Sequence, residues 1–114
     1  GRLRHGSNTL TGDVLIDAAR AIAADVLLMG AHAITDGILS ETAPEVAAVK
    51  RALMQAAAVK RLLVDSSKFR PRAFMRVAVA TQMDEIVTDD GAPAGEVRKL
   101  RSSGVAVTLV RRTA

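Results

Sequence analysis

Residues 62–68 read Leu-Leu-Val-Asp-Ser-Ser-Lys, an apolar triplet followed at once by four polar residues. A short apolar run that ends abruptly in a polar turn is typical of a buried strand in a parallel sheet. Residues 26–29, Val-Leu-Leu-Met, have the same character and are closed by Gly30. These two runs predict a core that is built on parallel strands.

The segments around these runs alternate between helical and strand patterns. Apolar residues at helical spacing predict helices over residues 11–25, residues 44–58 and the stretch from Pro93 to a C-cap at Gly104. Further apolar runs predict strands over residues 77–79, 86–87 and 105–110. The alternation predicts one α/β domain with a mostly parallel sheet and flanking helices.

The predicted helix over residues 44–58 has two distinct faces. Pro44 lies in its first turn, where a missing N–H costs nothing, and Ser40 or Thr42 is the expected N-cap. We expect Lys50 and Arg51 to lie on the face turned away from the apolar stripe.

The basic residues are concentrated in one part of the chain. Residues 50–76 carry eight Lys or Arg and a single acid, Asp65, for a net charge of +7. The rest of the chain has a net charge of −3, which gives +4 overall. Both a solvated basic surface and a site for an anion fit this distribution.

Composition excludes several classes of site. The chain has no cysteine, so it holds no disulfide, thiolate metal ligand or thiol nucleophile. Its two histidines, His5 and His32, are far apart in sequence and leave little for a zinc site. Two Phe without Tyr or Trp cannot build the stacking platforms that bind single-stranded nucleic acid.

Targeting signals and common catalytic or nucleotide motifs are also missing. No apolar run approaches the ~20 residues that a membrane span needs, and no signal peptide opens the sequence. We therefore expect a cytoplasmic protein without a membrane partner. Neither a Walker A loop, a GxGxxG loop nor a GxSxG elbow is present.

Ligands of open parallel sheets bind beyond the carboxyl ends of the strands. Three predicted loops leave such ends, over residues 30–37, 65–72 and 88–93. Their polar residues are His32, Thr35, Asp36, Asp65, Ser66, Ser67, Lys68, Arg70, Arg72, Thr88, Asp89 and Asp90. Lysine and hydroxyl groups suit a phosphate, and carboxylates accept from ligand hydroxyls.

Two plainer interpretations of these loops remain open. Polar residues follow the strands of any α/β domain, whether or not a ligand binds there. The pair Asp89-Asp90 beside Gly91 fits ordinary turn chemistry as well as it fits a divalent cation.

Three motifs together resemble the C-terminal sensor domain of DeoR-family transcriptional repressors. They are Ala47-Ala48-Val49-Lys50-Arg51-Ala52-Leu53-Met54, Leu62-Leu63-Val64-Asp65-Ser66-Ser67-Lys68-Phe69 and Ile86-Val87-Thr88-Asp89. Upstream, residues 1–3, 11–12, 28–30 and 37–40 are similar to the middle section of that domain, so the resemblance covers nearly the whole chain.

The resemblance implies a fold like that of ribose-5-phosphate isomerase and the coenzyme A transferases. It implies a bacterial regulator whose sensor domain binds a phosphorylated sugar intermediate, with operator DNA bound by a separate N-terminal winged helix-turn-helix domain. It implies a binding module rather than an enzyme, and we expect no catalytic residue, cofactor or metal. The residues it implies for the effector site are Lys68 with Asp65 and Ser67 beside it, Asp89, Lys50 and His32.

The chain departs from the family pattern at several points. We expect it to begin after the family's early glycine- and threonine-rich loop and without the DNA-binding domain, so that residues 1–114 form the C-terminal part of a sensor domain. Where relatives often read GxDG, this chain has Gly30-Ala31-His32-Ala33, which replaces a hydroxyl acceptor with an imidazole. Val46 stands where an acid often precedes the helix motif, with Glu45 one position earlier.

Two other functions stay open at this point. A sugar-phosphate isomerase-like enzyme would need a carboxylate base, for which Asp65 or Asp89 would have to serve. The basic stretch would alternatively bind DNA directly. Because a partial sheet exposes strand edges, we also expect a homo-oligomer.

Overall fold

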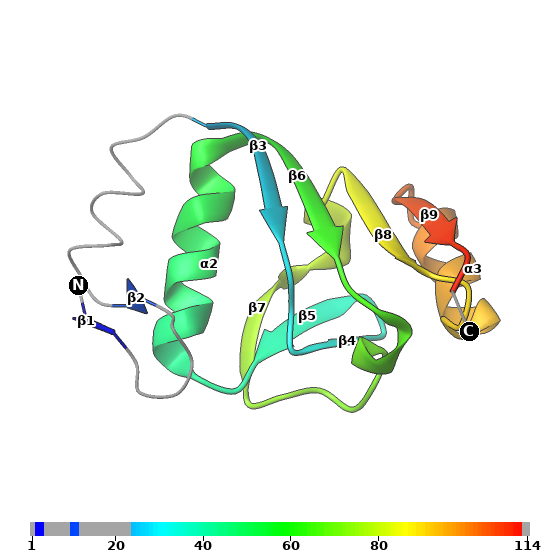
Figure 1. Ribbon diagram of the computed structural model, residues 1–114, viewed down its shortest axis with the longest axis horizontal. Coiled ribbons are helices and arrows are strands. Elements are labelled where there is room, and N and C mark those ends of the chain that lie inside the picture. The colour runs from blue at the N-terminus through cyan, green and yellow to red at the C-terminus, as the bar shows by residue number, and fades with distance from the viewer. Residues whose placement is uncertain (1, 4–9, 12–23, 113–114) are drawn as a thin grey trace.

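The computed structural model describes residues 2–3, 10–11 and 24–112 (Figure 1). Two short strands, β1 (Arg2–Leu3) and β2 (Leu10–Thr11), pair in antiparallel fashion. The helix predicted over residues 11–25 falls mainly on residues 12–23, which lie outside the described residues. Residues 24 and 25 belong instead to the first strand of the main sheet.

The main sheet confirms the predicted α/β class with parallel strands. Its four strands are β3 (Ala24–Met29), β6 (Ala57–Leu63), β8 (Glu85–Asp89) and β9 (Ala106–Val110). They lie in the order β3-β6-β8-β9, and every neighbouring pair is parallel. Because all four strands are parallel, their carboxyl ends lie at one edge of the sheet.

Strand β6 is longer than predicted. It begins at Ala57 rather than Leu62, directly after the preceding helix, and pairs with β3 from Ala57 opposite Ala24 to Leu62 opposite Met29. Lys60 and Arg61 interrupt its apolar run, which is why the sequence pattern predicts only its end.

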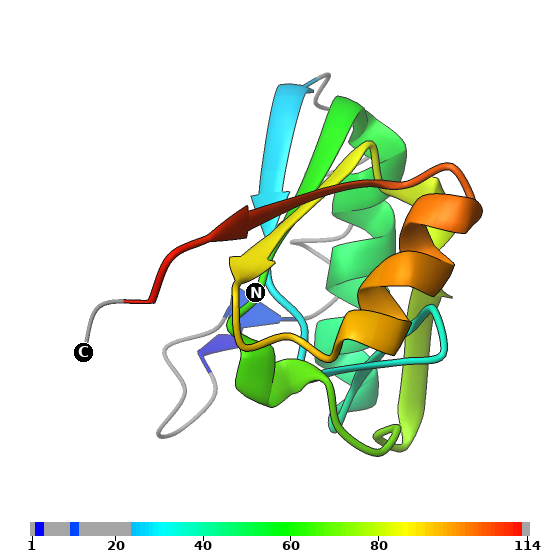
Figure 2. The ribbon, with the colours of Figure 1, turned by 90° about the vertical axis from the view of Figure 1, so that its right-hand side faces the viewer.

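The two α-helices in the described part of the chain lie on the same face of the main sheet (Figure 2). Helix α2 (Pro44–Ala56) has Pro44 at its start as predicted, but its N-cap is Ala43, without a side-chain hydrogen bond. The predicted cap at Ser40 or Thr42 is wrong, because the Ser40 hydroxyl is buried and accepts from the N–H of Ala73 at 2.9 Å.

Helix α3 (Ala94–Ser102) follows Pro93 and ends near Gly104, as predicted. Gly104 has φ of +94°, and the N–H of Val105 reaches back to the carbonyl of Leu100 at 3.1 Å. Such a left-handed residue after a helix is the usual place for glycine. No helix in the described part of the chain is long and apolar enough to cross a membrane.

A second, antiparallel sheet lies beside the main one and was not predicted. It contains β4 (Ala33–Thr35), β5 (Ile38–Glu41) and β7 (Met75–Val79) in the order β4-β5-β7. The expectation of a loop over residues 30–37 is therefore wrong. Asp36 and Gly37, with φ of +49° and +77°, make a two-residue hairpin turn, and Asp-Gly between apolar residues is a strong hairpin signal.

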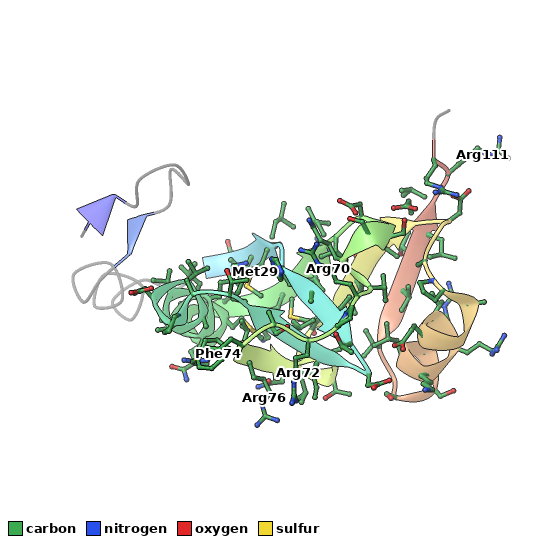
Figure 3. The ribbon with its side chains drawn as sticks, turned by 90° about the horizontal axis from the view of Figure 1, so that it is seen from below. Met29, Arg70, Arg72, Phe74, Arg76 and Arg111 are labelled. Atoms are coloured by element: carbon green, nitrogen blue, oxygen red, sulfur yellow. The ribbon has the colours of Figure 1, made fainter. Side chains whose placement is uncertain are left out.

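The 3-10 helix η1 (Ser66–Lys68) follows β6, and residues 69–74 connect it to β7. The side chains of this connection point in different directions (Figure 3). Arg70 bonds to the His32 carbonyl oxygen just after β3, whereas Arg72 and Phe74 project from the molecule, as does Arg76 on β7. Phe74 is 84% exposed.

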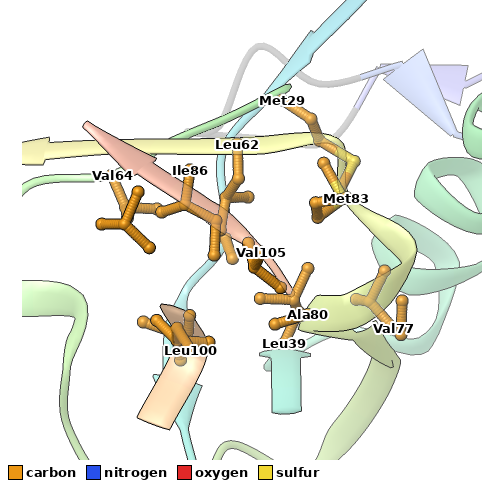
Figure 4. Packing of buried hydrophobic residues seen from close by; sticks show 14 of the residues in the cluster. Met29, Leu39, Leu62, Val64, Val77, Ala80, Met83, Ile86, Leu100 and Val105 are labelled. Atoms are coloured by element: carbon orange, nitrogen blue, oxygen red, sulfur yellow. The ribbon is translucent and has the colours of Figure 1, made fainter. Parts of the chain in front are cut away.

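The core fills the space between the main sheet, the helices and the second sheet (Figure 4). Leu62, Ile86 and Leu39 are completely buried there. The opposite face of the main sheet is different, since Leu28 on β3 is 59% exposed and Leu63 on β6 is 44% exposed. Among the described residues, only one face of the main sheet is thus covered.

The two faces give a direct test of this packing. Leu62→Ala should lower the free energy of unfolding by about 2–5 kcal/mol, because it removes a buried side chain and leaves a cavity. Leu28→Ala on the neighbouring strand should change it by no more than about 0.5 kcal/mol, because Leu28 is already solvated. Chemical denaturation measures both values. Equal losses would contradict the assignment of the covered face.

Candidate functional site

The turn after β6 and the end of β8 are joined by a backbone-to-carboxylate hydrogen bond. The N–H of Ser66 donates to Asp89 Oδ1 at 2.6 Å. Asp89 Oδ2 accepts from the N–H of Gly91 at 2.9 Å. Because the parallel register ends both strands at one edge, a single carboxylate spans the two turns. We call this arrangement the Asp89 clamp.

Asp65 organises the turn from its other end. Its Oδ1 accepts from the N–H of Ser67 at 2.9 Å and also from the Ser67 hydroxyl. Asp65 is thereby the N-cap of η1. Capping by aspartate at the start of a helical turn explains why the Asp-Ser-Ser sequence folds this way locally.

The clamp and the cap use up the backbone donors of the turn. Each N–H from residue 66 to residue 70 already has an acceptor within 3.2 Å. The acceptors are the carboxylates of Asp89 and Asp65 and the carbonyl oxygens of Asp65, Ser66 and Lys68. An anion at this turn therefore has to be bound by side chains rather than by free backbone N–H groups.

Lys68 is the side chain of the turn best suited to that task. It is half-buried at the end of η1. Within the described ranges, no hydrogen bond or ion pair joins its ammonium group to another residue. Three N–H donors on one flexible side chain are then left for a ligand.

Both carboxylates have a lowered pKa. The Ser67 hydroxyl and then the Ser67 N–H hold the pKa of Asp65 below its ordinary value. The N–H of Ser66 does the same for the pKa of Asp89, with smaller contributions from Gly91 and Arg112. Hydrogen bonds to the charged form stabilise it, so both groups stay ionised at neutral pH.

The Asp89-Asp90 pair already has a cation beside it. Arg112 Nε lies 3.5 Å from Asp89 Oδ2 and 3.2 Å from Asp90 Oδ1. Together with the bond from Gly91 to Asp89, this supports the turn interpretation of the pair rather than a divalent-cation site.

A second cluster lies where β3 ends. His32 accepts twice from Arg70, since Arg70 Nε lies 2.9 Å from the His32 carbonyl oxygen and Nη2 lies 3.0 Å from His32 Nδ1. The Thr35 hydroxyl bonds to the carbonyl of Arg70. The connection after η1 is thereby held against the end of β3.

Lys50 belongs to the same cluster and does not face away from the core as predicted. Its Nζ lies 2.5 Å from Glu41 Oε2 and 2.8 Å from the Gly30 carbonyl oxygen. Glu41 Oε2 also accepts from the N–H of His32 at 2.8 Å. The Lys50 side chain is only 20% exposed because a buried acid from β5 draws it inward.

Two cavities are lined by residues of these two clusters. One of about 360 Å³ lies between β6 and β8, with Asp65, Thr88 and Asp89 in its lining. Another of about 580 Å³ is lined by Thr35 and Arg70. A larger cavity of about 780 Å³ lies elsewhere, between the Asp36-Gly37 turn and α3.

Thr88 is unusual among the residues of the first cavity. It is 2% exposed, and its hydroxyl has no hydrogen-bond partner among the described residues. Buried hydroxyls nearly always have a partner, and Thr88 faces the covered side of the sheet with Ile86, so an ordered water is the partner that this hydroxyl calls for.

The structure therefore divides the six predicted site residues between two clusters. Asp65, Ser67 and Lys68 share the η1 turn, and Asp89 holds that turn. His32 and Lys50 meet through Glu41. Their role in effector binding stays a prediction.

Sequence reasoning missed the contribution of two residues, Glu41 and Arg70. A single acid after the apolar residues Ile38 and Leu39 is the only sequence signal for Glu41. Arg70 was one of many basic residues in its stretch, and nothing in the local pattern separates it from Arg72.

The lowered pKa of Asp89 predicts an acid-sensitive clamp. A carboxyl with a lower pKa in the folded than in the unfolded state stabilises the fold above the unfolded pKa of about 3.9. That stability is lost as the pH falls through the folded pKa. Asp89→Asn should therefore lower stability at pH 6 and flatten its decline between pH 5 and pH 2.5, as measured by denaturation. Asp25→Asn, at an exposed position, is the control. If the stability of both variants depends on pH in the same way, the clamp is contradicted.

Comparisons with known proteins agree with this arrangement. Residues 1–90 match the family described as the DeoR C terminal sensor domain. A protein of Escherichia coli O157:H7, named as an aga operon transcriptional repressor, is 30% identical over 112 residues. That match covers 96% of this chain but 41% of the relative, so the chain spans about two fifths of that protein's length. The predicted resemblance is confirmed, and the chain belongs to the family of DeoR C-terminal sensor domains.

Proposed function

We propose that this chain is the effector-binding part of a transcriptional regulator and that its effector is a phosphorylated sugar. The observation that carries the proposal is the set of unused donors and acceptors at the carboxyl edge of the main sheet. Lys68 supplies a cation on a turn whose backbone donors are all occupied.

The two carboxylates complement these groups. Asp65 and Asp89 each accept two hydrogen bonds from the protein, and a carboxylate has about four lone-pair sites. Each can still accept from a ligand hydroxyl. A ligand that fits these groups has an anionic group for Lys68 and hydroxyl groups for the two carboxylates. A sugar phosphate has both.

The same carboxylates are poorly suited to isomerase chemistry. A general base works best with a pKa near the operating pH. Hydrogen bonds from Ser66 and Ser67 lower the pKa of Asp89 and Asp65, so both are weak bases at neutral pH. We therefore favour a binding module over an enzyme.

The relative's printed name concerns repression of an operon. By analogy, we propose that the intact regulator binds operator DNA through a separate domain, and that effector binding here controls it. Direct DNA binding by α2 is disfavoured, because Lys50 is held by Glu41 and Gly30 inside the fold.

Ligand binding tests the proposal directly. Titration of the protein with a panel of aldose and ketose phosphates, followed by calorimetry and thermal shift, should reveal at least one that binds and stabilises it. Lys68→Ala should weaken that binding about tenfold or more, since it removes a charge-assisted hydrogen bond worth about 1.5–3 kcal/mol.

Lys99→Ala is the matched control for Lys68→Ala. The Lys99 side chain on α3 is 73% exposed, and its Nζ lies 3.9 Å from Asp36 Oδ1. Its removal should leave the affinity for the sugar phosphate unchanged. Absence of binding by every sugar phosphate would contradict the proposed function. If the two variants bind the sugar phosphate with equal affinity, Lys68 does not contact the ligand.

A further inference from the structure

We infer that Arg70 fixes His32 as a hydrogen-bond donor to the effector, so that the ligand presents an acceptor oxygen to the end of β3. The oxygen would belong to a carboxylate, carbonyl or phosphoryl group. The inference rests on the proposed function, because it names the ligand group that this part of the same site takes.

The chemistry of arginine decides the state of the His32 ring. A guanidinium group has five N–H donors, has no acceptor and stays protonated in proteins. Arg70 Nη2 lies 3.0 Å from His32 Nδ1, so Nδ1 has to be the acceptor of that bond. An imidazole that accepts at Nδ1 carries its proton on Nε2.

The contact is geometrically constrained on both sides. Arg70 Nε donates to the His32 carbonyl oxygen at 2.9 Å, so the guanidinium is held at two points of one residue. The carbonyl of Arg70 is in turn bonded by the Thr35 hydroxyl. Turning the ring over would place a carbon against Nη2 and lose the bond.

The backbone of His32 is also immobilised. Its N–H donates to Glu41 Oε2 at 2.8 Å and to the Ser40 carbonyl oxygen at 3.1 Å. Nε2–H is then the polar group of His32 that has no partner in the part of the chain that the structure describes. The residue is half-buried, so this donor is open to a ligand at the edge of the sheet.

The neighbouring charges favour an acceptor opposite this donor. Two positive groups lie near His32: Arg70 bonds to it directly, and Lys50 is linked to it through Glu41. Glu41 is the acid of the cluster, and its Oε2 already accepts from Lys50 and from the His32 N–H. An ammonium group on a ligand would be repelled here, whereas an anionic or carbonyl oxygen would be attracted.

The state of the ring is measurable without any ligand. Nitrogen-15 NMR of the protein at about pH 8 should show His32 as one neutral tautomer, with Nε2 protonated and Nδ1 an acceptor. Arg70→Met should allow the Nδ1-protonated form to appear. Arg76→Met, which removes an exposed arginine that projects from the molecule (Figure 3), should leave the His32 signals unchanged. A protonated Nδ1 in the wild-type protein would overturn the inference.

A pair of isosteric variants tests the direction of the bond to the ligand. His32→Gln offers an N–H donor beside an acceptor for Arg70, whereas His32→Glu keeps the acceptor for Arg70 and replaces the donor with another acceptor. With the sugar phosphate that binds best, the Gln variant should stay within about threefold of wild type. The Glu variant should bind about tenfold or more weakly.

The outcomes separate this inference from the proposed function. If the wild type binds a sugar phosphate but the Gln and Glu variants bind it equally, His32 does not donate to the ligand and the inference alone fails. If the wild type binds none of the sugar phosphates, the proposed function fails and the inference fails with it. The melting temperature of each variant is measured as well, so that weaker binding caused by partial unfolding is recognised.

Discussion

The hydrogen bond from the Ser66 N–H to the Asp89 carboxylate is the constraint around which the candidate site is built. It joins the turns that follow β6 and β8, two strands already adjacent in the sheet. Because Asp89 holds Ser66 and Asp65 caps Ser67, the turn has little freedom left. The position of Lys68 at the edge of the sheet follows from these two carboxylates, and the electrostatics of both are set by the same contacts.

Much of the main sheet could be predicted from the sequence, since buried parallel strands appear as short apolar runs and α2 and α3 have proline or glycine at their ends. Of the second sheet, only β7 was predicted, as the strand over residues 77–79, because β4 and β5 mix apolar with polar residues and contain no apolar run. The turns carrying Lys68 and Asp89 were located from their motifs, but the partners of each N–H were not. Periodicity also placed Lys50 on a solvated face, because it cannot register a buried acid on another element.

The main sheet is covered unevenly in the described residues. The helices lie on one face (Figure 2), while Val26, Leu28, Leu63 and Val110 on the other are each more than 40% exposed. Strand β3 has one neighbour, β6, in the part that the structure describes. Exposed apolar area and an open strand edge both favour association with another polypeptide. The homo-oligomer stays a prediction, and this exposed apolar surface supports it.

The contacts of the basic residues in the stretch 50–76 favour an anion site over a nucleic-acid surface. Four of its eight cations have partners within the chain, and they are Lys50, Arg51, Arg61 and Arg70. Three of these four cations, Lys50, Arg51 and Arg70, bond to backbone carbonyl oxygens, and Arg70 also bonds to the His32 ring. These neutral partners fix the side chains without cancelling their charge. A nucleic-acid surface needs mobile, solvated cations that reach successive phosphates. Two of the held cations, Lys50 and Arg70, bond to carbonyl oxygens just after β3 and raise the potential at this carboxyl end, where a small anion with several oxygens is the better match.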